Sequence, residues 1–422
     1  MPIPLKRVLK SIIWIIVRVR QGAREHKVGD AAVDKFGIRI AVMMLWVSLP
    51  VFAQELPPDE IQVNLSGYFD TFNVQIGYPS VTVTKKVTES TSVTGRYLVD
   101  VISAASMRST FKVDGVTSAT NKTSGGGDNT PDELRHELNA GITQILGDAT
   151  LSLNGIYSTE HDYTSSTVAG HISYPLAKKN TTLQAGVVRS WDTVSPQIRT
   201  WQKNKDVLHL SSSISQILSP RLISQLNFSY IQYNGFLSDP YQVVQILATD
   251  NRGNPVVRTY ESVVPDSRRR QAIGTRTNYL LSDISALEAG YRYYWDDWDV
   301  NSHTISLAYN RYFHNRQVRL RWGIRSYFQS QASFFREHYT EPERYMTVDS
   351  KLNEQFSNEY QFNATFTDGF RLPLLNIPLA TEHQSFHFKL NVYHRHTATP
   401  DWHSRMLNMY ALIINVGIRF EI

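Results

Sequence analysis

Arginine and glutamate residues recur with an even spacing in the C-terminal half of the chain. Arg319, Arg321 and Arg325 follow one another at intervals of two and four residues, and Arg292 stands four residues after Glu288. Side chains an even number of positions apart on a β-strand share one face. Guanidinium groups on a face that lines water can select solutes by charge, so this spacing predicts an anion-selective surface.

The same face is expected to continue on a preceding segment, where Arg270 and Arg276 also lie an even number of residues apart. Charges around a water-filled lumen would favour the passage of anions. The alternative is that cross-strand ion pairs only stiffen the wall. The residues predicted to line the lumen and select solutes are Arg270, Arg276, Glu288, Arg292, Arg319, Arg321 and Arg325.

A second group of candidate residues surrounds the segment 236–266. Its arginines are expected to pair with its aspartates and to fold this segment down as a lid or constriction. The sharper alternative is a ligand or divalent-cation site made of four aspartates, since Ca²⁺ and Mg²⁺ prefer carboxylate oxygens. The group, expected at the outer rim of adjacent strands, comprises Asp239, Pro240, Asp266, Arg268, Asp296, Asp297, Trp298 and His303.

Several kinds of chemistry are excluded or unsupported. The chain has no cysteine, which excludes disulfides, thiolate zinc sites and cysteine nucleophiles. Walker loops, nucleotide-binding glycine fingerprints, zinc-protease motifs and nucleophile elbows are not found. His387, His394 and His396 suggest a metal by their number, but His387 and His394 differ in parity and belong on opposite faces. We therefore predict no metal site, no cofactor and no catalytic residue.

The first 53 residues have the features of a leader with a signal peptide. Lys35 and Arg39 precede an apolar run at about 40–49, and Ala53 follows it at the position expected for signal-peptidase cleavage. We predict cleavage after Ala53, which leaves residues 54–422 as a single domain. The part upstream, 1–34, is either an extended leader or the product of a start codon placed too early.

Composition narrows the class of protein. Nine of the 43 basic and three of the 38 acidic residues lie in residues 1–53, so the net charge of +5 belongs to the leader and the rest of the chain is nearly neutral. Near neutrality removes the argument for a nucleic-acid partner. A mean hydropathy of −0.30 argues against a polytopic helical membrane protein. The 22 Tyr, 18 Phe and 8 Trp suit an interface between water and an apolar phase.

From residue 61 onward, apolar and polar residues alternate in segments that are separated by alternately short and long polar connections. This alternation is typical of a transmembrane antiparallel β-barrel, here an all-β meander of about 16 strands. The predicted strands are 61–72, 74–86, 92–103, 133–146, 149–160, 163–175, 180–192, 203–217, 221–235, 267–280, 285–298, 300–313, 317–330, 350–368, 382–397 and 407–421.

An even number of strands leaves both termini on one side of the membrane, which is expected to be the periplasm. The last strand ends near Phe420 and resembles the signal that the barrel-assembly machinery reads, although Glu421 and Ile422 follow it. We therefore expect this machinery and outer-membrane lipid as partners. The connections expected to face outward include the long segments 104–132, 193–202, 236–266 and 331–349.

Three segments near the predicted rim resemble an uncharacterised bacterial family, the domain of unknown function 3570. They run from Gly235 to Tyr241, from Pro265 to Arg270, and from Tyr291 to His303. The resemblance extends through nearly all of the mature chain and implies an outer-membrane barrel without assigning a chemistry. Asp299 stands where the family pattern is expected to have glycine, which leaves the tightness of that hairpin turn open.

Together these patterns predict a porin-like channel of the bacterial outer membrane that passes small hydrophilic, preferentially anionic solutes. The second hypothesis is a closed barrel that serves as a scaffold or receptor for a periplasmic or surface partner, with its pore blocked by loop 236–266. An enzyme with rim His, Ser and Asp residues, such as a hydrolase, ranks third, and nothing in the sequence specifies one.

Overall fold

The computed structural model describes residues 56–72, 74–104, 133–367, 369–371, 378–398 and 407–422. The predicted leader, the cleavage after Ala53 and most of the first long connection lie outside the described residues, so they stay predictions. Within the described part, nearly all regular structure is β-strand. Two short 3-10 helices, η2 (Ala177–Lys179) and η3 (Ser350–Leu352), complete it.

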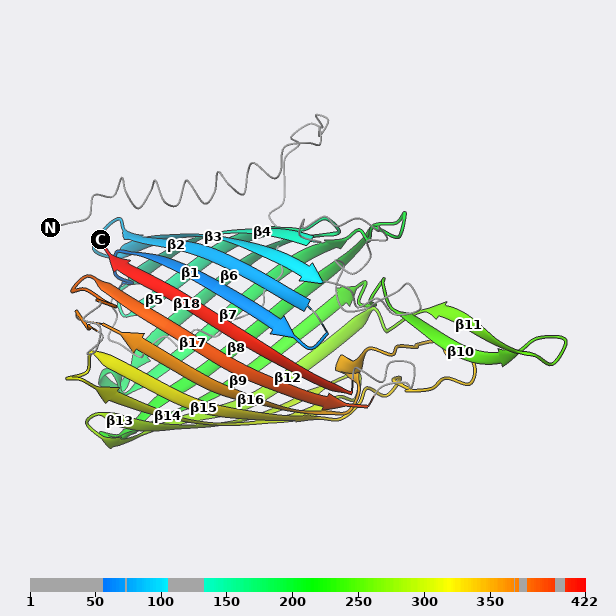
Figure 1. The fold of residues 1–422 in the computed structure, drawn as a ribbon. Helices are drawn as coiled ribbons and strands as arrows, with labels where there is room; N and C mark the ends of the chain where they lie inside the picture. Colours follow the sequence, from blue (N-terminus) through cyan, green and yellow to red (C-terminus); the bar gives the residue numbers. More distant parts are fainter. Residues whose placement is uncertain (1–55, 73, 105–132, 368, 372–377, 399–406) are drawn as a thin grey trace, which may run out of the picture. The chain divides into compact units, whose positions relative to one another are not determined.

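Sixteen of the strands form one closed antiparallel barrel, which confirms the predicted fold class. Each strand pairs with the next along the chain, and the first pairs with the last (Figure 1). The barrel strands are β1 (Glu60–Asp70), β2 (Val74–Lys86), β3 (Thr91–Ala104), β4 (Glu133–Leu146), β5 (Ala149–Thr159), β6 (Tyr163–Leu176), β7 (Thr181–Val194), β8 (Lys203–Ser219), β9 (Leu222–Gly235), β12 (Ser267–Ser282), β13 (Ser285–Asp296), β14 (Asn301–Phe313), β15 (Val318–Gln329), β16 (Gln355–Phe366), β17 (Gln384–Thr397) and β18 (Asn408–Glu421).

Two strands stand outside the barrel. β10 (Val243–Thr249) and β11 (Pro255–Glu261) pair only with each other and form a hairpin within the segment 236–266. The chain leaves the barrel after β9 and re-enters it at β12, so β9 and β12 are neighbours in the barrel. The sequence interpretation treated 236–266 as a loop and missed this hairpin.

The outer surface of the barrel is apolar. Each of the sixteen barrel strands exposes at least one large apolar side chain, as Leu65, Leu138, Leu226 and Leu307 illustrate. Because closure leaves no unpaired strand edge, such a barrel can lie in hydrocarbon with all its ladder hydrogen bonds made. In the part of the chain that the structure describes, no helix is long and apolar enough to cross a bilayer.

Tyrosine and histidine meet on the outer surface near the end of the barrel that carries the long loops. The Tyr97 hydroxyl lies 2.8 Å from His136 Nδ1, and the Tyr291 hydroxyl lies 2.8 Å from His303 Nδ1. His394 stacks on Tyr410 with ring centroids 4.6 Å apart. Amphipathic rings at this level are typical of the interface between lipid and water, so His303 belongs to an aromatic girdle.

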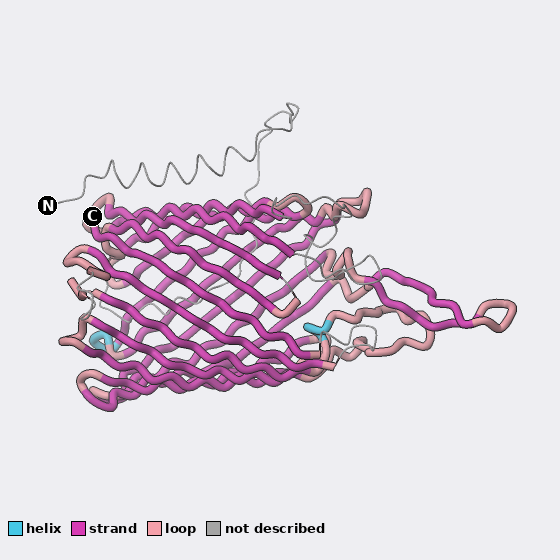
Figure 2. Tube along the Cα trace, viewed as in Figure 1, coloured by secondary structure: helices cyan, strands magenta, loops and turns pink. Residues whose placement is uncertain are grey.

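The two ends of the barrel differ. At the end where β18 finishes, most connections are short turns such as 147–148, 220–221 and 283–284. At the other end, which we call the loop end, the segments 195–202, 236–266 and 330–354 gather (Figure 2). The hairpin β10–β11 extends from this end away from the barrel (Figure 1). Long loops on one side are expected to face the cell exterior.

One predicted boundary differs clearly from the structure. The strand expected at 350–368 begins only at Gln355. Residues 350–352 form η3 instead, and Leu352 is buried against the loops of the neighbouring hairpins. The apolar packing of Leu352 therefore holds the chain away from the barrel wall at a place where the alternating pattern would have continued the strand.

Candidate functional site

An ion pair between Arg268 and Asp296 joins β12 to β13 at the loop end. Both side chains are buried, 7% and 0% exposed, and Arg268 donates to Asp296 Oδ2 from Nε at 2.8 Å and from Nη2 at 2.5 Å. The Tyr294 hydroxyl donates to the same oxygen. The backbone N–H groups of Trp298 and Val300 donate to Oδ1 at 2.9 and 3.0 Å. Oδ1 of this carboxylate therefore shapes the turn between β13 and β14, while Oδ2 holds the Arg268 and Tyr294 side chains.

The turn between β13 and β14 is tight although it contains no glycine. Asp299 has a φ of +66°, in the left-handed region that aspartate tolerates better than most residues. The Asp296 carboxylate holds the amides on either side of it. The departure from the glycine expected in the family pattern is thus accommodated without opening the turn.

Trp298 joins this turn to the loops around it. Its ring lies under the Arg268 guanidinium, 4.2 Å from centroid to Cζ, and its Nε1 donates to the Ser267 carbonyl at 2.9 Å. It belongs to an apolar cluster with Val264, Val300, Ala332, Phe335 and Leu352. These residues come from segments 236–266, 297–300 and 330–354, so burial of their side chains holds three loops together.

A second cluster fixes the base of the projecting hairpin. Val244 and Ile246 of β10 pack against Tyr339, Met346 and Val348, and Val244 is fully buried. Val263 and Met346 exchange two backbone hydrogen bonds of 2.8 Å. Residues 236–242, 262–266 and 330–354 therefore form one ordered unit, which we call the loop cap.

The loop cap is also tied to the far side of the barrel mouth. The Tyr241 hydroxyl donates to the Asp162 carboxylate and accepts a hydrogen bond of 3.2 Å from the Gln197 amide. Arg199 pairs with Glu261 at 3.1 Å. Gly235, where the chain leaves β9, has a φ of +106°, and a Cβ there would collide with the Asn204 carbonyl. A glycine is therefore required at the start of this crossing.

Beneath the loop cap lies a cavity of about 820 Å³. Pro240, Tyr241, Asp349, Lys351 and Leu352 contribute to it from the cap. The barrel wall and its rim contribute the carboxylates Glu160 and Asp162 together with a larger number of basic and tyrosine side chains: Arg135, Tyr163, Lys205, Tyr233, Arg268, Arg270, Arg292, Tyr294 and Tyr327. The cavity is thus polar and aromatic, with basic groups from both the wall and the cap.

The structure places the predicted lumen arginines on the inner face. Arg319, Arg321 and Arg325 share parity with Tyr327, which lines the cavity, whereas Trp322 on the opposite parity is exposed on the outer surface. Their partners differ: Arg321 lies 3.2 Å from Glu288, and Arg325 lies 3.5 Å from Glu359. Arg276 also approaches Glu288, at 3.9 Å. The cross-strand ion pairs of the second hypothesis are therefore present for Arg276, Arg321 and Arg325, and the selection of solutes by charge stays a prediction.

Other predicted lumen cations form no ion pair with a carboxylate in the described part of the chain. They are Arg270, Arg292 and Arg319. Strand β17, which is separated from β15 by β16, adds Lys389, whose charge interacts with those of Arg319 and Arg321. Strands β12 to β17 thus present a basic half of the wall, in which carboxylates are outnumbered.

The opposite half of the wall carries the balancing carboxylates. In a ring of sixteen strands, β15 stands across from β5. There Arg135 reaches three carboxylates, Asp100 at 2.9 Å, Glu137 at 3.6 Å and Glu160 at 3.6 Å. The lumen therefore has one basic side and one side where arginine is neutralised.

The four rim aspartates do not converge. Asp297 pairs with Arg269 at 3.3 Å on the surface, while Asp296 is occupied by Arg268. The Asp266 side chain is exposed, and Asp239 caps the amide of Tyr241. Among the described residues, no group of three or more His, Asp or Glu could hold a metal ion. The cation-site alternative for these aspartates therefore has no geometric support, and the Arg–Asp pairing applies to two of the four.

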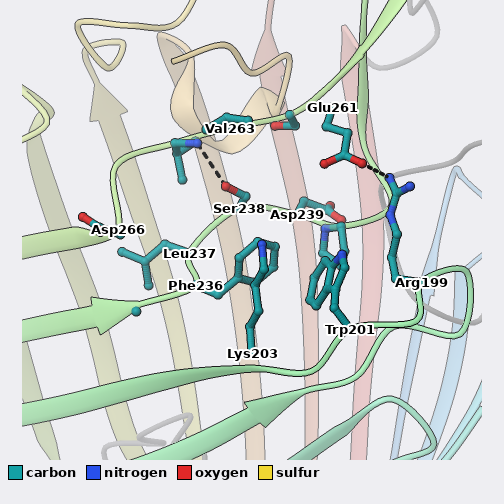
Figure 3. Close-up of a pocket in the computed structure, with 14 residues that line it drawn as sticks. Arg199, Trp201, Lys203, Phe236, Leu237, Ser238, Asp239, Glu261, Val263 and Asp266 are labelled. Carbon is teal, nitrogen blue, oxygen red and sulfur yellow. Dashed lines mark hydrogen bonds and ion pairs between the residues drawn. The ribbon is translucent and has the colours of Figure 1, made fainter. Parts of the chain in front are cut away.

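A smaller notch of about 170 Å³ lies beside the cavity, where Asp239, Pro240 and Asp266 contribute to its lining (Figure 3). The Lys203 ammonium lies 4.3 Å from the Trp201 ring and 4.5 Å from the Phe236 ring. The Val264 amide donates to Ser238 Oγ across it at 3.0 Å. These contacts brace the base of the loop cap against β8.

Burial raises the pKa of Asp239 to about 6, and the nearby Asp349 carboxylate adds to the effect. When the loop cap is released, the carboxyl returns to its ordinary pKa of 3.8. Between pH 3.8 and about 6, Asp239 therefore holds its proton in the packed cap and loses it in the released cap. Its stability is complete below the lower pKa and falls as the pH rises through about 6.

We expect residues 236–242 to be about 2 to 3 kcal/mol better protected from hydrogen exchange at pH 4 than at pH 7.5, after correction for intrinsic rates. Asp239→Asn keeps the acceptor for the Tyr241 amide and should abolish the difference. The matched control is Asp250→Asn at the hairpin tip, where an exposed carboxyl has a lowered pKa. Equal protection of the unaltered protein at both pH values would contradict the prediction.

Sequence reasoning missed several cavity residues. Tyr294 and Tyr327 have the parity of the predicted lumen arginines on their strands, so the alternation could have identified them, whereas Tyr233 lies on β9, which has no such arginine. Asp192 and Lys205 pair at 3.2 Å on the inner face and could have been found in the same way. Lys351 lies in an irregular loop, where no period marks its direction.

The apolar exterior and closed antiparallel sheet identify the protein as a β-barrel of the bacterial outer membrane. The fold is similar to a bacterial polysaccharide outer membrane secretin, with 5% identity, a TM-score of 0.49, and coverage of 86% of this chain and 98% of that one. It is also similar to OccD3 (OpdP) of Pseudomonas aeruginosa, with 8% identity, a TM-score of 0.43, and coverage of 88% and 94%. The siderophore receptor PirA of Pseudomonas aeruginosa has 9% identity, a TM-score of 0.42, and coverage of 87% and 81%.

No curated protein matches the sequence. A family model does match it, over residues 48–202 and 197–413, and its description is "Protein of unknown function (DUF3570)". The match includes the three rim segments 235–241, 265–270 and 291–303, together with both loops of the cap and nearly all of the barrel. The chain therefore belongs to the DUF3570 family of proteins of unknown function.

Proposed function

We propose that this barrel is a channel for small hydrophilic solutes with a preference for anions. The observation that carries the proposal is the basic half of the lumen wall on β12 to β17. There Arg270, Arg292 and Arg319 have no carboxylate partner among the described residues. Unpaired guanidinium groups along an aqueous path lower the energy of an anion and raise that of a cation.

The position of the segment 236–266 supports a path through the mouth. Its central part, Val243 to Glu261, forms the hairpin that projects away from the barrel (Figure 1). Within this segment, the residues that line the cavity all lie between Phe236 and Tyr241. A blocked pore, as the receptor hypothesis requires, would need a larger part of this loop inside the barrel.

Changing Arg319, Arg321 and Arg325 together to Ser is expected to lower the ratio of anion to cation permeability by roughly threefold to tenfold, because three positive charges leave the lumen. The reversal potential of the refolded protein in a planar bilayer under a KCl gradient measures this ratio. Arg189→Ser with Arg311→Ser is the control, since both side chains lie on the outward-facing parity. A ratio unchanged by the triple substitution would refute the role of these arginines, and absence of any current would refute the channel.

A surface receptor is the second candidate, and the projecting hairpin favours it. Leu247 and Val257 are partners across the ribbon and are 71% and 56% exposed. An apolar patch exposed on a projecting ribbon is a feature that marks contact sites for another protein. Deleting 243–261 separates the candidates: a channel should keep its current, whereas a receptor should lose its partner and show no current before or after the deletion.

A further inference from the structure

We propose that Arg270 and Arg292 bind a dianionic oxyanion, either a phosphate monoester or a dicarboxylate, in the cavity beneath the loop cap. The site deepens the proposed channel function, because it names the class of solute that the channel would recognise. It does not require conduction, since a ligand could also occupy it in a closed barrel.

Arg270 is held in place, but its Nε lacks an acceptor. Its guanidinium lies 4.7 Å from the centre of the Tyr233 ring, and its Nη1 lies 3.5 Å from the Tyr233 hydroxyl. Its Nε is buried and has no hydrogen-bond partner. A buried donor without an acceptor is costly, and the Arg270 side chain lines the cavity. An oxyanion beside it would supply the missing acceptor.

Arg292 is the second uncompensated cation. It lies across the ladder from Thr304, whose buried Oγ1 also has no hydrogen-bond partner. Its guanidinium is 5.6 Å from the Tyr294 ring centre, and in the described residues no carboxylate pairs with it. Arg292 also repels both Arg270 and Arg325. Like charges gathered in this way favour a ligand of opposite charge.

The neighbouring Arg268 shows that the lack of partners is local. It lines the same cavity, yet its Nε and Nη2 both donate to Asp296, and its guanidinium packs on the Trp298 ring. Arg325 likewise has Glu359 at 3.5 Å. The wall thus compensates the cations around the site and leaves two positive charges, on Arg270 and Arg292, without a partner.

Charge and shape then define the ligand. Two guanidinium groups match two negative charges, and their planar donors suit the oxygens of a phosphate or carboxylate better than a spherical halide. The adjoining Tyr233, Tyr294 and Tyr327 present ring surfaces to the remainder of the ligand. A monovalent carboxylate would leave one arginine uncompensated and is expected to bind more weakly.

The test measures block of the KCl current by added anions at pH 8 in a planar bilayer. Inorganic phosphate and succinate should reduce the current at concentrations at least about tenfold below those of acetate, because each dianion engages both arginines. Arg270→Gln with Arg292→Gln should weaken the block by roughly a hundredfold, in keeping with two lost charge-assisted contacts. Block by phosphate alone assigns the phosphate class, and block by succinate alone assigns the dicarboxylate class.

Arg276→Gln with Arg321→Gln is the matched control, since it also removes two charges from the lumen wall but outside the cavity, where Glu288 lies 3.9 Å from Arg276 and 3.2 Å from Arg321. Equal weakening by this control would attribute the block to general lumen charge and overturn the site. Calorimetric titration of the detergent-solubilised protein with phosphate and with succinate gives a second readout. Binding without any current would uphold the site and refute the channel, whereas current with neither block nor heat would uphold the channel and refute the site.

Discussion

Asp296→Ala is expected to release the loop cap while the barrel stays folded. The substitution removes the acceptor of Arg268, of the Tyr294 hydroxyl and of two backbone amides. It leaves the Arg268 guanidinium buried without a counter-charge, and breaking a buried ion pair in this way costs about 3–5 kcal/mol. The wall of sixteen paired strands does not depend on this contact, so the loss should be confined to the loop end.

Limited trypsin digestion of the folded protein in detergent measures this release. The loop cap contains Arg336, Arg344 and Lys351, which should become cleavable in the variant, while heating should still shift the mobility of the unboiled barrel on a gel. Asp297→Ala is the control, because its pair with Arg269 is exposed and such pairs contribute about 0–1 kcal/mol. Cleavage at equal rates in the two variants would mean that the buried pair does not hold the cap.

Locking the loop cap is expected to have the largest effect on solute passage. Val263 and Met346 form an antiparallel pair that exchanges both backbone hydrogen bonds. The Cα atoms of such a pair are about 5.5 Å apart, within the range that a disulfide spans. The chain has no cysteine, so Val263→Cys with Met346→Cys would create a single defined cross-link. If the cap must move to admit solute, oxidation should lower phosphate or succinate flux by roughly tenfold or more, and a reductant should restore it.

A second disulfide serves as the control for the effect of oxidation and reduction on the protein. Leu247→Cys with Val257→Cys would join the two strands of the hairpin without linking them to segment 330–354. Oxidation of this variant should leave the flux unchanged. Liposome swelling or radiolabelled uptake, measured before and after reduction, compares the two variants. Equal flux through the oxidised and reduced forms of the cap-locked variant would show that solute passes without separation of segments 262–266 and 330–354.

The barrel could be predicted closely because the local sequence pattern and the packing between lipid and water both require apolar and polar residues to alternate. A strand between lipid and water must alternate along its length, and the turns that separate strands contain residues such as Gly147 and Pro220. The strands β2 and β4 accordingly have the predicted bounds. The hairpin β10–β11 was missed because its strands are short and lie in a loop, although the turn through Gly253 was a usable signal.

The site could be predicted only in part. Parity was enough to place Arg292 and Arg319 on the inner face, and the position of Asp296 near Arg268 followed from the neighbouring strands. The partners of these site residues could not be predicted. They depend on side chains from loops, where apolar residues do not recur at a regular spacing. Phe335, which is 1% exposed, shows the difficulty: nothing local indicates that it packs beside Trp298 and Leu352.

The pairing of β1 with β18 has a consequence for how the barrel is made. Every other contact in the ring joins strands that follow one another, apart from the excursion at β10–β11, so those pairs can form in order. The seam joins residues such as Ser66 and Asn415, which are 349 positions apart. Closing so long a loop is slow, and until it happens the sheet has two open edges that can pair with other chains. The time that the nascent sheet spends unclosed is therefore set by this one seam, where the hydrogen bond from Asn415 to Ser66 and the ion pair of Arg419 with Glu60 favour the correct register over a shifted one.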